Sequence, residues 1–173
     1  MNKLAIALTA ALSLGAAASA SAADATIDFS GEIKDLTCSI GVGSASNTSL
    51  TLKTITTDAV NNGAASRQTP FQLAMGEAGS TCAAGAVELS FEKTNVSSAG
   101  RLTNTDGTGA ENIELAILNG TTPMNLNSDV LTHTFPAGGG THAWNLTASY
   151  EKAGAADVTE GNFETALLIN VKY

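Results

Sequence analysis

The amino-acid sequence predicts an all-β fold, either a sandwich or a barrel. Apolar or alternating runs recur along the chain, and turn signals rich in glycine, asparagine, aspartate and serine separate them. No stretch keeps a helical period, and prolines are few. A helical turn is expected within residues 58–67. The expected strands are 27–33, 37–42, 49–52, 71–75, 87–91, 113–118, 131–135, 143–150 and 163–173.

Residues 1–22 have the features of a secretory signal peptide. Lys3 supplies the positive start, residues 4–18 form the apolar stretch, and Ala20-Ser21-Ala22 is a small-residue cleavage site. We expect cleavage after Ala22, with Ala20 and Ala23 as near alternatives. The apolar stretch is too short to span a bilayer, and no other stretch is long and apolar enough, so direct membrane insertion is not expected.

Cys38 and Cys82 are the only two cysteines. Two cysteines behind a secretory signal indicate one disulfide in an oxidising compartment. The alternative is a metal or redox pair, which the sequence disfavours because it has no C-x-x-C motif and no histidine beside either cysteine. The sequence therefore predicts a Cys38–Cys82 disulfide.

Charge and composition exclude several classes of function. A net charge of −8 argues against nucleic-acid binding and against anionic membranes, because both require a basic surface. His133 and His142 are the only histidines, and no G-x-S-x-G motif occurs. We expect no catalytic residue, no cofactor and no metal. His133 is expected to be a half-buried strand residue, and Trp144 and Tyr150 are expected to face the core.

The last thirteen residues alternate at period two, which is typical of a β-strand with one apolar face. An apolar edge strand invites pairing with another strand. The alternative is an ordinary last strand inside a closed sandwich. The apolar face carries Phe163, Thr165, Leu167, Ile169, Val171 and Tyr173, and the other face carries Glu164, Ala166, Leu168, Asn170 and Lys172.

Residues 23–34 alternate in the same way. Their apolar face could line a groove while their polar face meets water, although a plain first strand of a sandwich would show the same pattern. Burying Ile27, Phe29 and Ile33 would contribute about 5–9 kcal/mol before entropy, which rivals the stability of about 5–15 kcal/mol of a typical domain. The apolar face carries Ala25, Ile27, Phe29, Gly31 and Ile33.

Three features together carry a family resemblance. Residues 27–33 run directly into Asp35-Leu36-Thr37-Cys38, a Thr-Pro-Phe strand at 69–71 precedes Cys82, and Gly161 stands twelve residues before Tyr173. With these features the chain resembles a pilin subunit of the chaperone–usher (type 1-like) fimbrial family, over essentially all of residues 23–173. One departure is visible: the family's tyrosine is usually penultimate, whereas Tyr173 is the last residue here.

The resemblance implies an incomplete immunoglobulin-like β-sandwich that a donated strand from a neighbouring subunit completes. It divides the chain into a signal peptide (1–22), an N-terminal donor-strand segment (23–34) and a pilin domain (35–173). A periplasmic chaperone would lend a strand first, and at the outer-membrane usher the donor segment of the next subunit would replace it. The donor residues would be Ala25, Ile27, Phe29, Gly31 and Ile33, and the acceptor-groove and chaperone-contact residues would be Gly161, Phe163, Thr165, Leu167, Ile169, Val171 and Tyr173.

The function that follows is a structural subunit of a cell-surface fimbria, exported through the periplasm, joined to other pilin subunits and supporting cell adhesion without catalysis. The alternative is a self-contained secreted carbohydrate-binding sandwich that would use Trp144 and exposed asparagine and aspartate loops.

Overall fold

The computed structural model describes residues 38–78 and 80–173. Contacts divide the chain into two units, residues 1–34 and 35–173, and all described residues belong to the second unit. The expected signal peptide, the expected donor segment and the predicted strand 27–33 lie outside the described residues.

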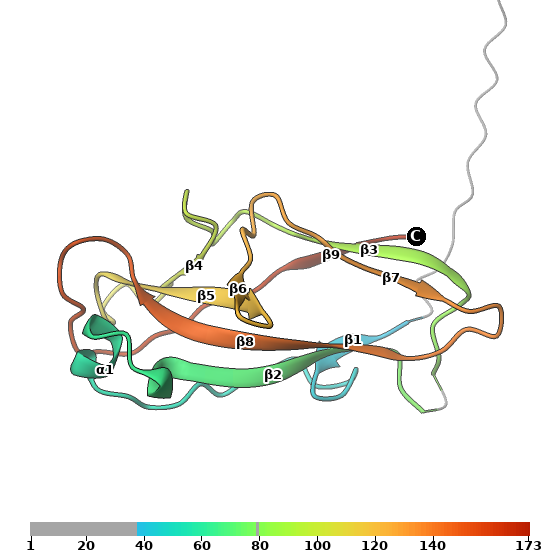
Figure 1. Ribbon diagram of the computed structural model, residues 1–173, viewed down its shortest axis with the longest axis horizontal. Coiled ribbons are helices and arrows are strands. Elements are labelled where there is room, and N and C mark those ends of the chain that lie inside the picture. The colour runs from blue at the N-terminus through green and yellow to red at the C-terminus, as the bar shows by residue number, and fades with distance from the viewer. Residues whose placement is uncertain (1–37, 79) are drawn as a thin grey trace, which may run out of the picture. The chain divides into compact units, whose positions relative to one another are not determined.

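The described residues form two antiparallel sheets that pack face to face (Figure 1). In the larger sheet the strand order is β1-β2-β8-β5-β4, and β6 pairs with β5. Its strands are β1 (Ile40–Val42), β2 (Gln68–Met75), β8 (His142–Lys152), β5 (Ile113–Asn119), β4 (Leu102–Thr103) and β6 (Thr122–Pro123). The long pairings of β8 with β2 and with β5 hold this sheet together.

The smaller sheet has the order β7-β3-β9, with β7 at Leu131–Phe135, β3 at Gly85–Phe91 and β9 at Ile169–Lys172. Its central strand β3 pairs antiparallel with both neighbours. The two sheets enclose one apolar core, and the predicted all-β sandwich is confirmed.

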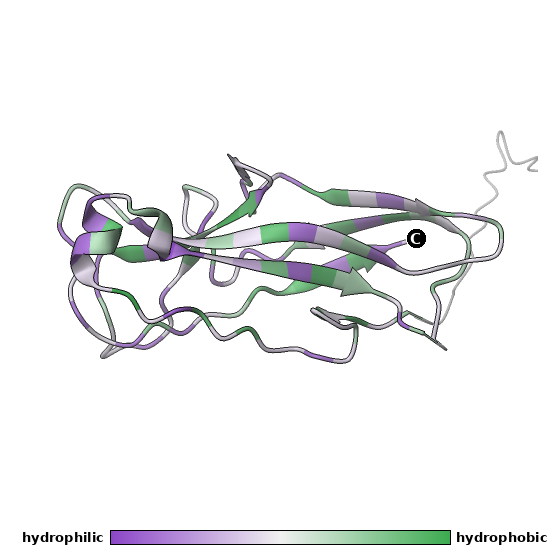
Figure 2. Ribbon diagram, turned by 60° about the horizontal axis from the view of Figure 1, so that its bottom comes forward, coloured by the Kyte–Doolittle hydropathy of each residue, from purple (hydrophilic) through white to green (hydrophobic). Residues whose placement is uncertain are grey.

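Alternation along the strands builds the core. On β8, Trp144, Leu146, Ala148 and Tyr150 are buried, whereas Ala143 and Asn145, on either side of Trp144, are exposed. Figure 2 shows the same alternation as bands of hydrophilic and hydrophobic residues along the strands. The expectation that Trp144 and Tyr150 face the core is confirmed.

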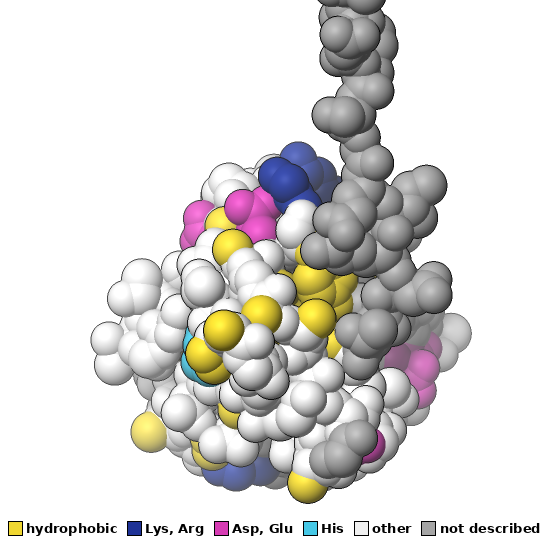
Figure 3. Space-filling view, turned by 90° about the vertical axis from the view of Figure 1, so that its right-hand side faces the viewer, with side chains coloured by type: hydrophobic (Ala, Val, Ile, Leu, Met, Phe, Trp, Pro, Cys, Tyr) yellow, Lys and Arg dark blue, Asp and Glu magenta, His cyan; other side chains and the backbone are white. Residues whose placement is uncertain are grey.

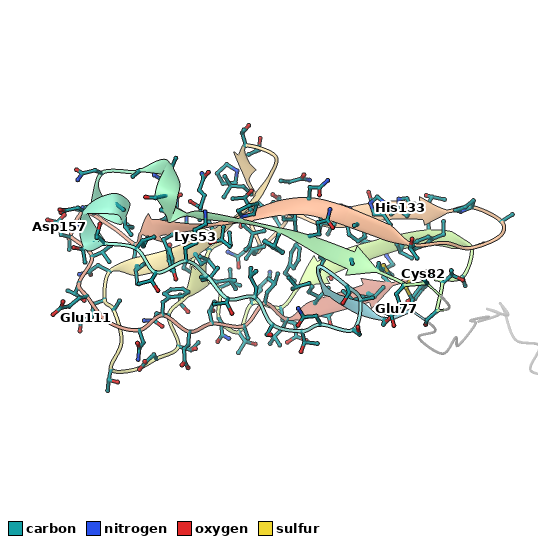
Figure 4. The ribbon with its side chains drawn as sticks, turned by 90° about the horizontal axis from the view of Figure 1, so that it is seen from below. Lys53, Glu77, Cys82, Glu111, His133 and Asp157 are labelled. Carbon is teal, nitrogen blue, oxygen red and sulfur yellow. A yellow bond between two sulfur atoms is a disulfide. The ribbon has the colours of Figure 1, made fainter. Side chains whose placement is uncertain are left out.

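Cys38 and Cys82 form the predicted disulfide, and both residues are buried, with 2% and 1% of their surface exposed. Cys82 also exchanges two backbone hydrogen bonds with Gly140, at 2.8 and 3.0 Å. The disulfide therefore lies next to the connection between β7 and β8. Figure 4 labels Cys82 and His133 at this end of the sandwich.

The predicted helical turn is confirmed as two short helices, α1 (Thr57–Asn61) and the 3-10 helix η1 (Ala65–Arg67). The Thr56 side chain caps α1 by accepting a hydrogen bond from the Ala59 N–H. Gly120-Thr121 turns the chain from β5 into β6, and Gly120 has the positive φ of 64° that such a turn needs.

Two strand predictions need correction. Residues 49–52 belong to no strand: β1 ends at Val42 opposite Leu73, and among the described residues no ladder joins 49–52 to β2. The C-terminal strand is shorter than predicted, since only Ile169–Lys172 lie opposite β3, whereas residues 163–168 run past a loop. The two-residue strands β4 and β6 were not predicted, because two residues show no period.

Candidate functional site

The described domain carries a long groove with a volume of about 1300 Å³. Its walls are two extended segments, residues 48–57 and 159–169, and its floor is the inner face of the larger sheet. Figure 4, seen from below, shows the two walls running alongside each other with side chains between them. The groove therefore lies between segments that are more than 100 residues apart in the sequence.

The floor of the groove is apolar. Leu73 of β2, Leu115 and Ile117 of β5, and Ala148 of β8 lie along it and are all buried. Apolar surface of this kind gains stability when a partner covers it, at about 25 cal/mol for each Å² removed from water. The floor residues are part of the main core, so the groove opens directly onto it.

The C-terminal wall alternates in exposure. Odd-numbered residues from Phe163 to Val171 are half-buried, and the even-numbered residues between them are exposed. The predicted two-faced pattern is therefore present even where no ladder forms. Phe163 packs edge-to-face against Tyr150, with their ring centroids 5.3 Å apart, and burial raises the pKa of the Tyr150 hydroxyl.

Hydrogen bonds tie only one edge of this wall. The carbonyls of Asn162, Glu164 and Leu168 accept from the N–H groups of Ala110, Thr105 and Glu92 at 2.8, 2.7 and 3.0 Å. These three accepting residues are all even-numbered, and successive backbone groups of an extended chain point to opposite sides. The backbone groups of the odd-numbered residues therefore point along the opposite edge, towards the groove.

Among the described residues, no partner is found for the backbone N–H groups of Phe163, Thr165 and Leu167. The Thr165 hydroxyl is also buried and has no hydrogen-bond partner in the described domain. Unpaired backbone groups beside an apolar floor are costly unless another chain or water satisfies them. This edge is thus suited to pairing with an extended polypeptide.

The opposite wall is held loosely. Leu50, Leu52 and Ile55 are half-buried and pack against the core. Within the described part of the chain, the backbone of residues 50–55 makes one hydrogen bond, from the Lys53 N–H to the Thr69 hydroxyl at 3.4 Å. Side-chain packing therefore holds this wall, and its backbone is available for strand pairing.

The structure places most of the predicted C-terminal residues at the groove. The wall includes Gly161, Phe163, Thr165, Leu167 and Ile169. Val171 instead packs against the core from β9, and Tyr173 lies outside the groove with 48% of its surface exposed. The predicted donor residues, from Ala25 to Ile33, lie outside the described residues. Contact of any of these residues with a chaperone stays a prediction.

Gly161 has a backbone conformation in which any residue with a Cβ atom would be strained. Its φ is 149°, and a Cβ atom built there would collide with the backbone of Gly109 and Ala110. The glycine lets the chain enter the groove wall close to this loop.

Sequence reasoning missed the opposite wall, although the alternation of Leu50 and Leu52 among polar residues was a signal for it.

The open tryptophan that the alternative function would use is not found in the described domain. Trp144, which a carbohydrate-binding module would use, is buried with 9% of its surface exposed, so it presents no open ring face to a sugar. Among the described residues, no three histidine, cysteine or acidic side chains gather as a metal site. No helix of the described chain is long and apolar enough to cross a membrane.

The described residues form an immunoglobulin-like sandwich with an apolar groove between two extended walls, a geometry suited to binding a polypeptide as an added β-strand. The family model described as fimbrial protein matches residues 27–173. The chain therefore belongs to the fimbrial protein family, and it is a structural subunit of a pilus. The family resemblance seen in the sequence is confirmed.

Solved structures agree on the fold. The P pilus rod subunit PapA is 19% identical, with a TM-score of 0.58 over 79% of this chain and 99% of that chain. A subunit from the structure of a chaperone–usher pilus, determined in work on rod uncoiling, is 20% identical, with a TM-score of 0.57 over 87% and 96%. No curated protein sequence matches the chain significantly.

Proposed function

We propose that this pilus subunit polymerises by donor-strand exchange, in which residues 23–34 of one copy fill the groove of the next. The observation that carries the proposal is the groove itself, an apolar channel into the core whose C-terminal wall has backbone N–H groups without a partner among the described residues. An added β-strand supplies what both features lack, namely main-chain hydrogen bonds and apolar side chains on alternate positions.

The donor segment fits the groove in length and pattern. Its apolar face runs from Ala25 to Ile33, nine residues, and the predicted acceptor residues that line the groove wall, from Gly161 to Ile169, also span nine residues. At about 3.3 Å per residue, both spans are about 30 Å. Three large side chains of the donor, Ile27, Phe29 and Ile33, would cover the apolar floor.

A contact between one subunit's extension and the next subunit's groove uses two different surfaces. Such a head-to-tail contact does not close on itself and grows a filament. The same groove would receive a strand from a periplasmic chaperone before assembly at an outer-membrane usher. The assembled polymer would stand on the cell surface and support adhesion. The partners are other pilin subunits, and no nucleic acid or cofactor takes part.

Peptide complementation tests the proposal. A synthetic peptide with residues 23–34 is added to the purified mature chain, and thermal unfolding is followed by circular dichroism. The expected result is a melting temperature that rises with peptide concentration, because a ligand that binds only the folded state stabilises it. A matched peptide with Phe29→Asp should give no rise. Equal melting curves with and without the unaltered peptide would show that the groove does not accept this segment.

A further inference from the structure

The only two histidines of the chain meet face to face between the two sheets. His133 lies on β7 in the smaller sheet and His142 lies on β8 in the larger sheet. Their ring centroids are 3.7 Å apart, and the ring planes differ by 9°. Both side chains are half-buried, as predicted for His133. The pair therefore joins the two layers of the sandwich across their edge.

Aromatic and apolar groups surround the pair. Trp144 packs edge-to-face on His142 at 4.5 Å, and Phe135 packs edge-to-face on His133 at 4.7 Å. Opposite the histidines in the sheets are Val87 of β3 and Met75 of β2, which are both buried. Figure 3, which views this end of the molecule, shows histidine atoms at the surface beside hydrophobic side chains.

No carboxylate faces the rings from these neighbouring strands. Glu88, the acidic residue of β3, points to the other face of its sheet, where it lies opposite Lys172 of β9. Glu77 follows the end of β2, and its backbone pairs with Ser80. The connection between β7 and β8, residues 136–141, carries no charged side chain. A proton gained by this pair would therefore have no facing counter-ion on these elements.

We propose that His133 and His142 form a pH-sensitive latch, which holds the two sheets together while at least one ring is neutral and weakens when both rings are protonated. Two positive charges on stacked rings at this distance repel each other, and water screens the repulsion only in part because both rings are half-buried. The pKa of His142 is lowered by its partial burial, which is the larger cause, and by the charge of His133, which is the smaller one.

The sign of the pH effect follows from proton binding. In the unfolded chain both histidines titrate near their ordinary pKa of about 6.5, whereas the folded pair resists the second proton. Below that pH the unfolded chain binds more protons, so stability falls as the pH falls. When the folded pair excludes one proton, the unfolding equilibrium constant rises as the pH falls. At one pH unit below the unfolded-state pKa it is about tenfold higher than at a pH well above that pKa.

The latch can be tested without reference to strand exchange. The mature chain is unfolded with urea at pH 7.5 and at pH 5.5, a window in which no side chain other than the two histidines ordinarily titrates. The unfolding equilibrium constant of the unaltered chain should rise by about five- to tenfold at the lower pH. The double variant His133→Gln with His142→Gln should change by less than about twofold.

Thr134→Gln is the matched control, because Thr134 is an exposed neighbour on β7 and its replacement keeps both histidines. This variant should keep the full pH dependence. Titration of the two imidazoles by NMR in the unaltered chain gives a second measurement that needs no variant. It should show two well-separated steps. Coincident titration at the ordinary pKa, or equal pH dependence in the unaltered chain and the double variant, would overturn the latch.

Discussion

Leu167 and Leu168 offer a direct test of the groove, because they are neighbours with opposite surroundings. Leu167 is half-buried on the groove wall, whereas Leu168 belongs to the exposed face of the same segment, with 41% of its surface exposed. We expect Leu167→Asp to prevent binding of the 23–34 strand and Leu168→Asp to leave it intact. Both variants introduce the same carboxylate at neighbouring positions. A difference in strand binding between them therefore reports on the groove and not on the added charge itself.

The size of the effect follows from burial. Completing the burial of a half-buried leucine contributes about 1 kcal/mol to strand binding. An unpaired carboxylate in the filled groove costs several kcal/mol more. The sum of about 4–6 kcal/mol weakens the dissociation constant at least about a thousandfold. At the exposed position of Leu168 the change should stay within about 0.5 kcal/mol, or a factor of about two.

The assay is fluorescence anisotropy of a labelled 23–34 peptide titrated with each purified chain. Circular dichroism of each variant checks that it is folded before binding is measured. The reasoning is refuted if Leu167→Asp binds the peptide as tightly as the unaltered chain does. It is also refuted if folded Leu168→Asp loses as much affinity as Leu167→Asp.

Three further predictions concern the donor, the disulfide and the glycine of the wall. Phe29→Asp should stop polymer growth, because the largest donor side chain would become a charge; normal filaments in electron micrographs would contradict the donor assignment. Replacing Cys38 and Cys82 together with alanine should lower the free energy of unfolding by about 4 kcal/mol, given their separation of 44 residues, and urea unfolding measures the loss. A change below about 1 kcal/mol would show that the crosslink adds little. Gly161→Ala should destabilise the domain by about 1–3 kcal/mol, because a Cβ atom would meet the backbone of Gly109 and Ala110 at a positive φ. An unchanged melting temperature would indicate that the loop yields without cost.

Alternation made most of the sandwich predictable. β7 was predicted with its observed bounds, because Leu131 and Phe135 are buried while Thr132 and Thr134 between them are exposed. The disulfide was predictable from two cysteines that follow a secretory signal. The C-terminal wall was predictable as an alternating segment, since the half-buried face exists before any ladder forms on it.

The remaining features of the fold and the groove depend on which segments lie side by side in the folded domain, and the sequence pattern does not specify this. All six residues from Ile113 to Leu118 are buried on both faces of β5, so their pattern does not show which side forms the groove floor. Residues 49–52 alternate as a strand does, yet the part of the chain that the structure describes offers them no ladder partner. The stacked histidines were equally hidden, because contact between β7 and β8 across the two sheets depends on how the layers align.

The position of the disulfide has a mechanical consequence for a filament under load. Cys38 closely follows residues 23–34, and it is bonded to Cys82. A pull on the chain ahead of Cys38 would pass through the sulfur bridge into Cys82 and on towards β3. The segment that the disulfide closes, residues 39–81, includes β1, β2 and the 48–57 wall, and the bridge gives this pull a covalent path that bypasses the backbone of that segment.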